Sequence, residues 1–342
     1  MKKIVFIVHT EYHLLFALKI MLSFHKDGDN EILIYQLSPK GSKRLNQELD
    51  FEDTDIVYRQ IIYENRKFQA RDLRPKLDEI ILVRPDVLYV FNEAQKVYSY
   101  LFGRLKQIGS RIGLCPDGAY VYFNNTPLKK RFIQFLYGNI FLWSNKFPSF
   151  LPFPSCYYAY HKEIDDVVVE DKTTYHNYTN KNIIEIKEQN YSREKFISLA
   201  DHIFRFNPLN TKIPSGSILW IDQPVEGMEE SKRLFLVELK RRYPLKKIYV
   251  KPHPHSFPSE INRLSKIEGF QIINLNIPVE LLVDNLKNVN ILSAFSTAMF
   301  YKNPTCTYYW VSPIFKELPL EYAKLATFEH IEVVSSLEQI DL

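Results

Sequence analysis

The feature that most constrains the fold is a repeated alternation of short apolar segments with segments of helical periodicity. In the first part of the chain the apolar segments lie at 2–10, 30–36, 55–61, 86–91 and 111–115, and the helical patterns at 11–25, 41–49, 76–83 and 95–108. Short segments that are apolar on both faces are typical of buried parallel strands, and the helices between them form the crossovers. The pattern predicts a doubly wound α/β domain over roughly residues 1–125.

The same alternation returns later in the chain. Strands are expected at 217–222, 247–251, 270–275 and 290–292, and helices at 228–243, 260–267, 279–286 and 297–302. The polar stretch 161–213 is expected to hold the crossover between domains, with one helix at 192–204. Neither half contains a glycine-rich dinucleotide fingerprint or a P-loop. We therefore predict two Rossmann-like α/β domains facing each other across a cleft, formed by residues 1–160 and 161–342.

Composition excludes several classes of protein. With 342 residues, 46% of them apolar and 25% charged, the chain suits two folded domains rather than a disordered protein. A net charge of only +4 does not favour nucleic acid as a partner. The three cysteines have no metal-ligand spacing, which indicates free thiols in a reducing compartment. Because the first apolar run is too short for a signal peptide and no 18-residue apolar stretch exists, we expect a cytoplasmic protein.

Residues 128–153 are unusually basic and aromatic, beginning with Lys129, Lys130 and Arg131. Three interpretations remain open. An amphipathic, cationic surface would contact the inner face of the membrane or a lipid-linked acceptor. Alternatively, the segment packs between the domains, or forms the interface of a homodimer.

The segment Lys251-Pro252-His253-Pro254 ends the apolar strand 247–251. Proline cannot donate to a strand ladder, so the strand stops there. Residues just past the carboxyl end of a strand face the ligand crevice of an open α/β sheet. An imidazole held there can bind an anion and give it a proton near neutral pH, although a loop histidine can also have a purely structural role.

Three further sites lie at expected strand ends or helix starts. Ser296 and Thr297 follow strand 290–292, where hydroxyls and backbone N–H groups suit a phosphate or simply cap the helix. Glu280, just after Pro278, either holds a ribose or complements the helix dipole. Asp117 and Gly118 follow strand 111–115. The pair can form a turn, or Asp117 can act as a general base.

Taken together, these segments resemble the motifs of bacterial sialyltransferases of the lipooligosaccharide and polysialic-acid type. The acidic residue before Gly118, the His-Pro pair at His253, and the paired hydroxyls at Ser296 and Thr297 occur in the same order. The gaps of 27 residues from His253 to Glu280 and 16 from Glu280 to Ser296 are also similar. The opening segment 9–15, which contains Thr10 and His13, resembles the start of these enzymes.

The resemblance implies a GT-B fold and an inverting transfer of sialic acid from CMP-sialic acid to a glycan of lipooligosaccharide or capsule, without a metal or other cofactor. Asp117 would take the proton from the acceptor hydroxyl, and His253 would bind and protonate the departing phosphate. Glu280 would hold the ribose, Ser296 and Thr297 the phosphate. The remaining implied site residues are Lys251 and Pro252 beside the nucleotide, and Thr10, His13 and Gly118 near the reacting sugars.

One departure leaves the base open, because Pro116 replaces the first of the two acidic residues usual before the glycine. Asp222, at the end of strand 217–222, and Glu226, just beyond it, are the alternative bases. Two other functions also remain open. One is a GT-B transferase with another donor, such as CMP-Kdo, CDP-glycerol or a UDP-sugar; the other is a non-catalytic glycan- or nucleotide-binding protein.

Overall fold

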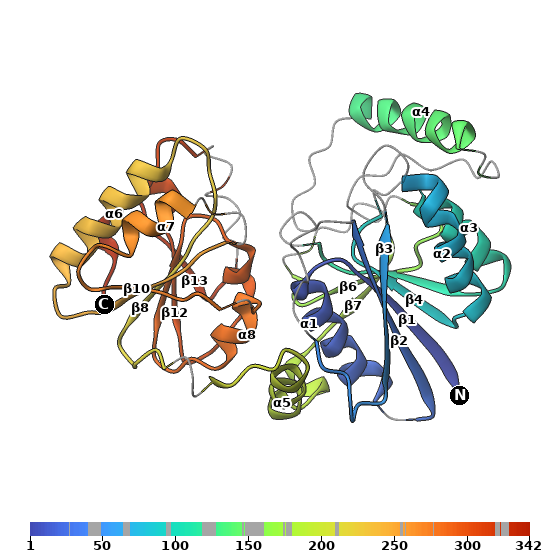
Figure 1. The fold of residues 1–342 in the computed structure, drawn as a ribbon, viewed down its shortest axis with the longest axis horizontal. Coiled ribbons are helices and arrows are strands. Elements are labelled where there is room, and N and C mark those ends of the chain that lie inside the picture. The colour runs from blue at the N-terminus through green and yellow to red at the C-terminus, as the bar shows by residue number, and fades with distance from the viewer. Residues whose placement is uncertain are drawn as a thin grey trace. The chain divides into compact units, whose positions relative to one another are not determined.

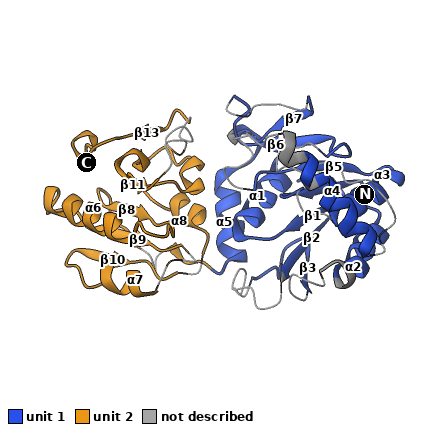
Figure 2. Cartoon of the chain, turned by 90° about the horizontal axis from the view of Figure 1, so that it is seen from above, with its two compact units in different colours: residues 1–205 blue, residues 206–342 orange. Residues whose placement is uncertain are grey.

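The computed structural model divides the chain into two compact units, Met1–Arg205 and Phe206–Leu342 (Figure 2). It describes residues 1–26, 28–39, 49–63, 69–93, 97–117, 128–145, 147, 161–173, 175, 180–208, 212–253, 256, 258–275, 277–318, 322 and 328–342. The boundary after Arg205 differs from the predicted division at residue 160. The reason is that two strands beyond residue 160 pair into the sheet of unit 1.

Unit 1 contains a seven-stranded parallel sheet with the order β3-β2-β1-β4-β5-β6-β7. Its strands are β1 (Lys2–Val8), β2 (Asn30–Pro39), β3 (Ile56–Tyr63), β4 (Val87–Val90), β5 (Arg111–Leu114), β6 (Asp166–Val169) and β7 (Asn182–Glu185). In β1, residues from Ile4 to Val8 are buried, so the strand is apolar on both faces as predicted. The five predicted strands of this half are confirmed as β1 to β5.

Helices cover both faces of this sheet, as a doubly wound arrangement requires. The helical elements are α1 (Glu11–Ile20), the π-helical η1 (Met21–His25), α2 (Gln69–Val83), α3 (Tyr98–Gln107), α4 (Leu128–Ser144), the 3₁₀ turn η3 (Glu188–Asn190) and α5 (Arg193–Ile203). Figure 1 shows α1 and α5 on one face, and α2 and α3 on the other. The helix predicted at 41–49 lies almost wholly outside the described residues.

The strands β6 and β7 were not predicted from the sequence. A side-chain ion pair joins β5 to β6 in addition to their backbone pairing. Arg111 forms a bidentate ion pair with Asp166 (2.6 and 2.7 Å). Asp165 adds a side-chain bond to the backbone N–H of Ile112 (2.8 Å). These contacts make residues 161–205 part of unit 1 rather than a crossover between domains.

Unit 2 contains a six-stranded parallel sheet with the order β10-β9-β8-β11-β12-β13. Its strands are β8 (Ile218–Ile221), β9 (Ile248–Lys251), β10 (Phe270–Ile272), β11 (Asn290–Ser293), β12 (Thr307–Trp310) and β13 (Ile331–Val333). Its helical elements are α6 (Glu229–Arg242), α7 (Pro258–Leu264), α8 (Val279–Asp284) and the 3₁₀ turns η5 (Thr297–Phe300), η6 (Ser312–Ile314) and η8 (Leu337–Gln339). The core is formed around Trp220, Leu236 and Leu292, all at most 1% exposed. The helix predicted at 297–302 is a short 3₁₀ turn instead, and β12 and β13 were not predicted.

Each sheet therefore grows in opposite directions from a central pair of strands, β1 and β4 in unit 1 and β8 and β11 in unit 2. At such a point the helices after the two strands leave to opposite faces, and the loops at the carboxyl ends separate into a crevice. The two-domain Rossmann-like α/β class predicted from the sequence is confirmed. No helix among the described residues is both long and apolar enough to cross a bilayer.

Candidate functional site

In unit 1, the carboxyl ends of three neighbouring strands carry polar side chains that contact one another. Thr10 follows β1 and caps α1, accepting a hydrogen bond from the backbone N–H of His13 (3.2 Å). Asn92 follows β4, and Asp117 follows β5. Because β1, β4 and β5 are adjacent in the sheet, His13 at the start of α1 and Asn92 both reach Asp117, although the three residues lie far apart in sequence.

The Asp117 carboxylate is held by one hydrogen bond on each oxygen. His13 Nε2 bonds to Oδ1 at 2.9 Å, and Asn92 Nδ2 donates to Oδ2 at 3.0 Å. The Asp117 side chain is still 34% exposed, whereas that of His13 is 2% exposed. Each carboxylate oxygen has a further lone pair, so the group is oriented yet can accept a proton from a substrate hydroxyl.

The His13 ring is fixed in orientation and in tautomer. It stacks on Phe91 with the ring centroids 4.4 Å apart and the planes 8° from parallel. The backbone N–H of His9 donates to His13 Nδ1 (3.2 Å), so this nitrogen carries no proton. Nε2 therefore bears the hydrogen and donates it to Asp117. His9 is tied in turn to Tyr98, whose hydroxyl lies 2.8 Å from His9 Nε2.

This environment favours the charged form of Asp117. Burial by itself would raise the pKa of the carboxyl group. The hydrogen bond from His13, the favourable electrostatic influence of the His13 and His9 ring N–H dipoles and the bond from Asn92 outweigh that effect, so the pKa of Asp117 lies below its ordinary value. The group is therefore an ionised carboxylate at neutral pH.

In unit 2, His253 lies two residues beyond β9, as predicted, and its main chain is bonded on both sides. Its backbone N–H donates to Ser256 Oγ (3.1 Å), and its carbonyl accepts from the backbone N–H of Ser256 (2.9 Å). The Lys251 ammonium donates to the carbonyl of Leu275 (2.6 Å), which connects the end of β9 to the segment after β10. Pro252 and His253 are both partly exposed.

The other predicted nucleotide residues lie on α8 and on the turn after β11. Glu280 is in the first turn of α8 and is 6% exposed. Ser296 is 3% exposed and caps η5, with its hydroxyl accepting from the backbone N–H of Ala298 (3.3 Å), while Thr297 is partly exposed. The capping role of Ser296 is thus present, and its hydroxyl hydrogen can still be donated to a ligand.

The two alternative bases have different surroundings. Asp222 is 3% exposed, and its oxygens accept from Lys232 Nζ (2.9 Å) and Ser256 Oγ (2.6 Å). Glu226 is exposed in the turn before α6. Burial and pairing disfavour Asp222 as a base for a substrate hydroxyl. Gly118 lies outside the described residues.

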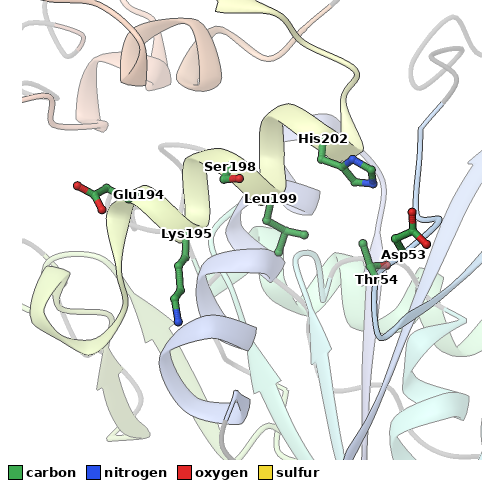
Figure 3. A pocket seen from close by; sticks show the side chains of 7 residues that line it. All are labelled: Asp53, Thr54, Glu194, Lys195, Ser198, Leu199 and His202. Atoms are coloured by element: carbon green, nitrogen blue, oxygen red, sulfur yellow. The ribbon is translucent and has the colours of Figure 1, made fainter.

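A pocket on unit 1 lies apart from these residues (Figure 3). Its walls come from α5 and from the turn before β3, and are formed by Asp53, Thr54, Glu194, Lys195, Ser198, Leu199 and His202. Within it, His202 is already bonded to the carbonyl of Glu52 (2.9 Å). None of the predicted site residues lines this pocket, so we do not assign it to the transfer reaction.

The family is established by a family-level sequence match. The model described as alpha-2,8-polysialyltransferase (POLYST) matches residues 45–307, which include Asp117, His253, Glu280 and Ser296. The chain belongs to this polysialyltransferase family. It is thus a sialyltransferase, as its motifs predicted. No individual protein of curated function matches the sequence.

Solved structures show which fold this sialyltransferase shares. The GT-B domain of a sialyltransferase from Photobacterium damselae is 15% identical, with a TM-score of 0.54 and 94% of each chain covered. UDP-N-acetylglucosamine 2-epimerases are similar too: that from Neisseria meningitidis is 12% identical (TM-score 0.51, 85% of this chain and 77% of that one), and that from Rickettsia bellii 14% identical (TM-score 0.50, 88% and 76%). The predicted GT-B fold is confirmed.

Sequence reasoning missed two polar residues that this sialyltransferase places beside its predicted site. Asn92 directly follows a strand predicted at 86–91, the same signal that singled out Asp117. Ser256 lies three residues after His253, a spacing that permits a side chain to close a turn. Both could have been found by examining every polar residue that follows a predicted strand.

Proposed function

We propose that the protein transfers sialic acid from CMP-sialic acid, with inversion, to a hydroxyl group of a bacterial lipooligosaccharide or capsule glycan. The observation that carries this proposal is the Asp117 carboxylate, which His13 and Asn92 hold in the ionised form at the carboxyl end of β5. Membership of the sialyltransferase family supports CMP-sialic acid as the donor.

Asp117 acts as the general base that removes the proton of the acceptor hydroxyl. Its carboxylate is partly exposed, and its fixed orientation lowers the entropic cost of reaching the transition state. General base catalysis typically contributes about 10²–10⁴-fold to the rate. Thr10 and His13 form the surroundings of this group, and Gly118 follows it in the sequence.

His253 binds the phosphate of the donor and protonates it as CMP leaves. Its position just past β9, next to the switch between β8 and β11, supports this role. Glu280 holds the ribose, Ser296 and Thr297 donate to the phosphate, and Lys251 and Pro252 complete the nucleotide site.

The description of the family favours a sialic acid as the acceptor, joined through an α-2,8 linkage. Mass spectrometry of products made with oligosialic acid and with a galactose-terminated glycan tests this. Repeated addition to the oligosialic acid is expected. Transfer to galactose alone would contradict the polysialic-acid assignment.

Calorimetric titration with CMP and UDP, without metal, tests the donor. We expect CMP to bind and UDP to bind more weakly, with CMP affinity reduced in His253→Ala. Preference for UDP would favour a UDP-sugar donor, and comparison of CMP-sialic acid, CMP-Kdo and CDP-glycerol as substrates separates the remaining donors. Transfer in the presence of EDTA tests the predicted independence from metal ions, and an Asp117→Asn variant as active as the wild type would refute the assigned base.

We further propose that α4 contacts the inner, cytoplasmic face of the membrane. Six of its large side chains are exposed and share an arc of about 140° at helical spacing: Phe132, Ile133, Leu136, Tyr137, Ile140 and Trp143. The opposite side packs on unit 1 through Leu142, which is 2% exposed. Phe147, just beyond α4, packs edge-on against Tyr100 of α3 (5.2 Å between ring centroids).

The charge of α4 suits anionic lipids. Its 17 residues include Lys129, Lys130 and Arg131 at the start and no acidic residue. Co-sedimentation with phosphatidylglycerol and phosphatidylcholine vesicles is the test. Trp143→Glu should weaken binding to the anionic vesicles, whereas Leu245→Glu, at a 96% exposed position in unit 2, should not. Self-association that depends on Trp143, measured by light scattering, would instead support the homodimer.

A further inference from the structure

A buried cluster of charged residues supports the segment that carries His253. Lys232 of α6 is 1% exposed, and its ammonium group contacts Asp222 Oδ1 (2.9 Å), Glu260 Oε1 (2.7 Å) and the carbonyl of Gln223 (3.0 Å). Burial would lower the pKa of Lys232, but the two carboxylates raise it above its ordinary value, so Lys232 is charged. Buried ions are costly to desolvate and add little stability over apolar side chains of the same size.

Asp222 links this cluster to the His253 segment through Ser256. Asp222 Oδ1 accepts from Lys232 and from Trp220 Nε1 (3.3 Å), whereas Oδ2 accepts from Ser256 Oγ at 2.6 Å. An ionised carboxylate can only accept hydrogen bonds, so the Ser256 hydroxyl must point its hydrogen at Asp222. The lone pairs of Ser256 Oγ are then directed to other donors.

The donor that uses this lone pair is the backbone N–H of His253 (3.1 Å). The bond from the backbone N–H of Ser256 to the carbonyl of His253 (2.9 Å) closes the same turn from the other side. The charge of Lys232 thus holds Asp222, Asp222 fixes the direction of the Ser256 hydroxyl, and Ser256 fixes the main chain of His253.

We propose that Ser256, oriented by Asp222 and Lys232, is a positioning residue that places His253 for its contact with the leaving phosphate. This inference rests on the proposed function of His253. It also assigns a role to Asp222, the residue that sequence reasoning had offered as an alternative base. A residue that merely stabilises unit 2 would lower activity whether or not His253 is present.

A double-mutant cycle separates these roles. The variants are Ser256→Ala, His253→Ala and the double variant, with kcat and KM for CMP-sialic acid measured in each, and CMP affinity by calorimetry. We expect Ser256→Ala to lower kcat about 10- to 100-fold, the typical cost of a displaced catalytic group. In the His253→Ala background the same change should alter kcat and CMP affinity by less than about twofold, because interacting residues are not additive.

Matched controls complete the experiment. Ser256→Thr keeps the hydroxyl and should retain kcat within about threefold. Ser265→Ala removes another serine hydroxyl of unit 2, which donates to the nearby carbonyl of Asn262 (3.0 Å), and should leave kcat unchanged. If the alanine variant does not fold, Ser256→Cys keeps the volume of the side chain and weakens both hydrogen bonds.

The possible failures are distinguishable. Two results would overturn the positioning role alone, provided that His253→Ala loses activity. In the first, Ser256→Ala keeps wild-type activity. In the second, Ser256→Ala lowers kcat by the same factor whether residue 253 is histidine or alanine. Wild-type turnover by His253→Ala overturns the proposed acid, and the positioning role falls with it.

Discussion

Replacement of His13 by phenylalanine tests the site most directly. The bond from His13 Nε2 to Asp117 Oδ1 (2.9 Å) is one of two side-chain hydrogen bonds that hold the carboxylate. Phenylalanine keeps the stack on Phe91 but has no donor. Because the lost bond stabilises only the ionised carboxylate, the pKa of Asp117 should rise in the variant.

The size of the effect follows from the strength of such a bond. A hydrogen bond to a charged group is worth about 1.5–3 kcal/mol, and each pKa unit corresponds to about 1.4 kcal/mol. The pKa of Asp117 should therefore rise by about one to two units. A base works when ionised, so the acid limb of the kcat/KM profile should move to higher pH by the same amount.

The assay is kcat/KM for transfer between pH 3.5 and 8, with His13→Gln as the matched control. Glutamine can place an amide donor near the position of Nε2, so its acid limb should stay close to that of the wild type. An unmoved acid limb in His13→Phe, with activity retained, would show that another group is the titrating base.

Three further outcomes are expected. Asp117→Asn should lower kcat by about 10²–10⁴-fold, while Glu226→Gln should change it less than about twofold; the reverse order would move the base to unit 2. Burial lowers the pKa of His161 from 6.5 to about 4, so the unfolded chain binds a proton between these pH values that the folded chain does not. The free energy of unfolding should therefore fall by roughly 3 kcal/mol as the pH drops from 6.5 to 4, and urea unfolding of His161→Gln should lack this component. Leu239→Ala, at a fully buried position on α6, should lower the free energy of unfolding of unit 2 by about 2–5 kcal/mol, measured by calorimetry. A smaller decrease would mean that the core there is loosely packed.

The fold was predictable wherever a strand is apolar on both faces. Such strands as β1 and β8 are visible in the sequence because consecutive residues, and not only alternate ones, are apolar, from Ile4 to Val8 in β1 and throughout β8. The strands β6 and β7 were missed because they lie in the stretch 161–213, which is polar overall, and β13 because its three residues include a glutamate. For these short strands, pairing with a neighbour decides the conformation, and a pairing such as that of Arg111 with Asp166 is not visible in local periodicity.

The sequence singles out the candidate site residues one at a time, but it does not give the contacts between them. Asp117 and His13 were each singled out by their places in the motifs, yet 104 residues separate them and only the order of the strands brings them together. Asp222 illustrates the opposite problem. From the sequence it was an acid at a strand end, and its burial against Lys232 depends on how α6 packs.

The place of β6 and β7 in the sheet has a practical consequence for work on the separate units. A fragment that stops at residue 160 would end its sheet at β5, whose unpaired N–H and C=O groups could recruit the strand of another molecule and promote aggregation. It would also leave Arg111 without Asp166. Expression of unit 1 alone should therefore retain every residue through Arg205, where the compact unit ends.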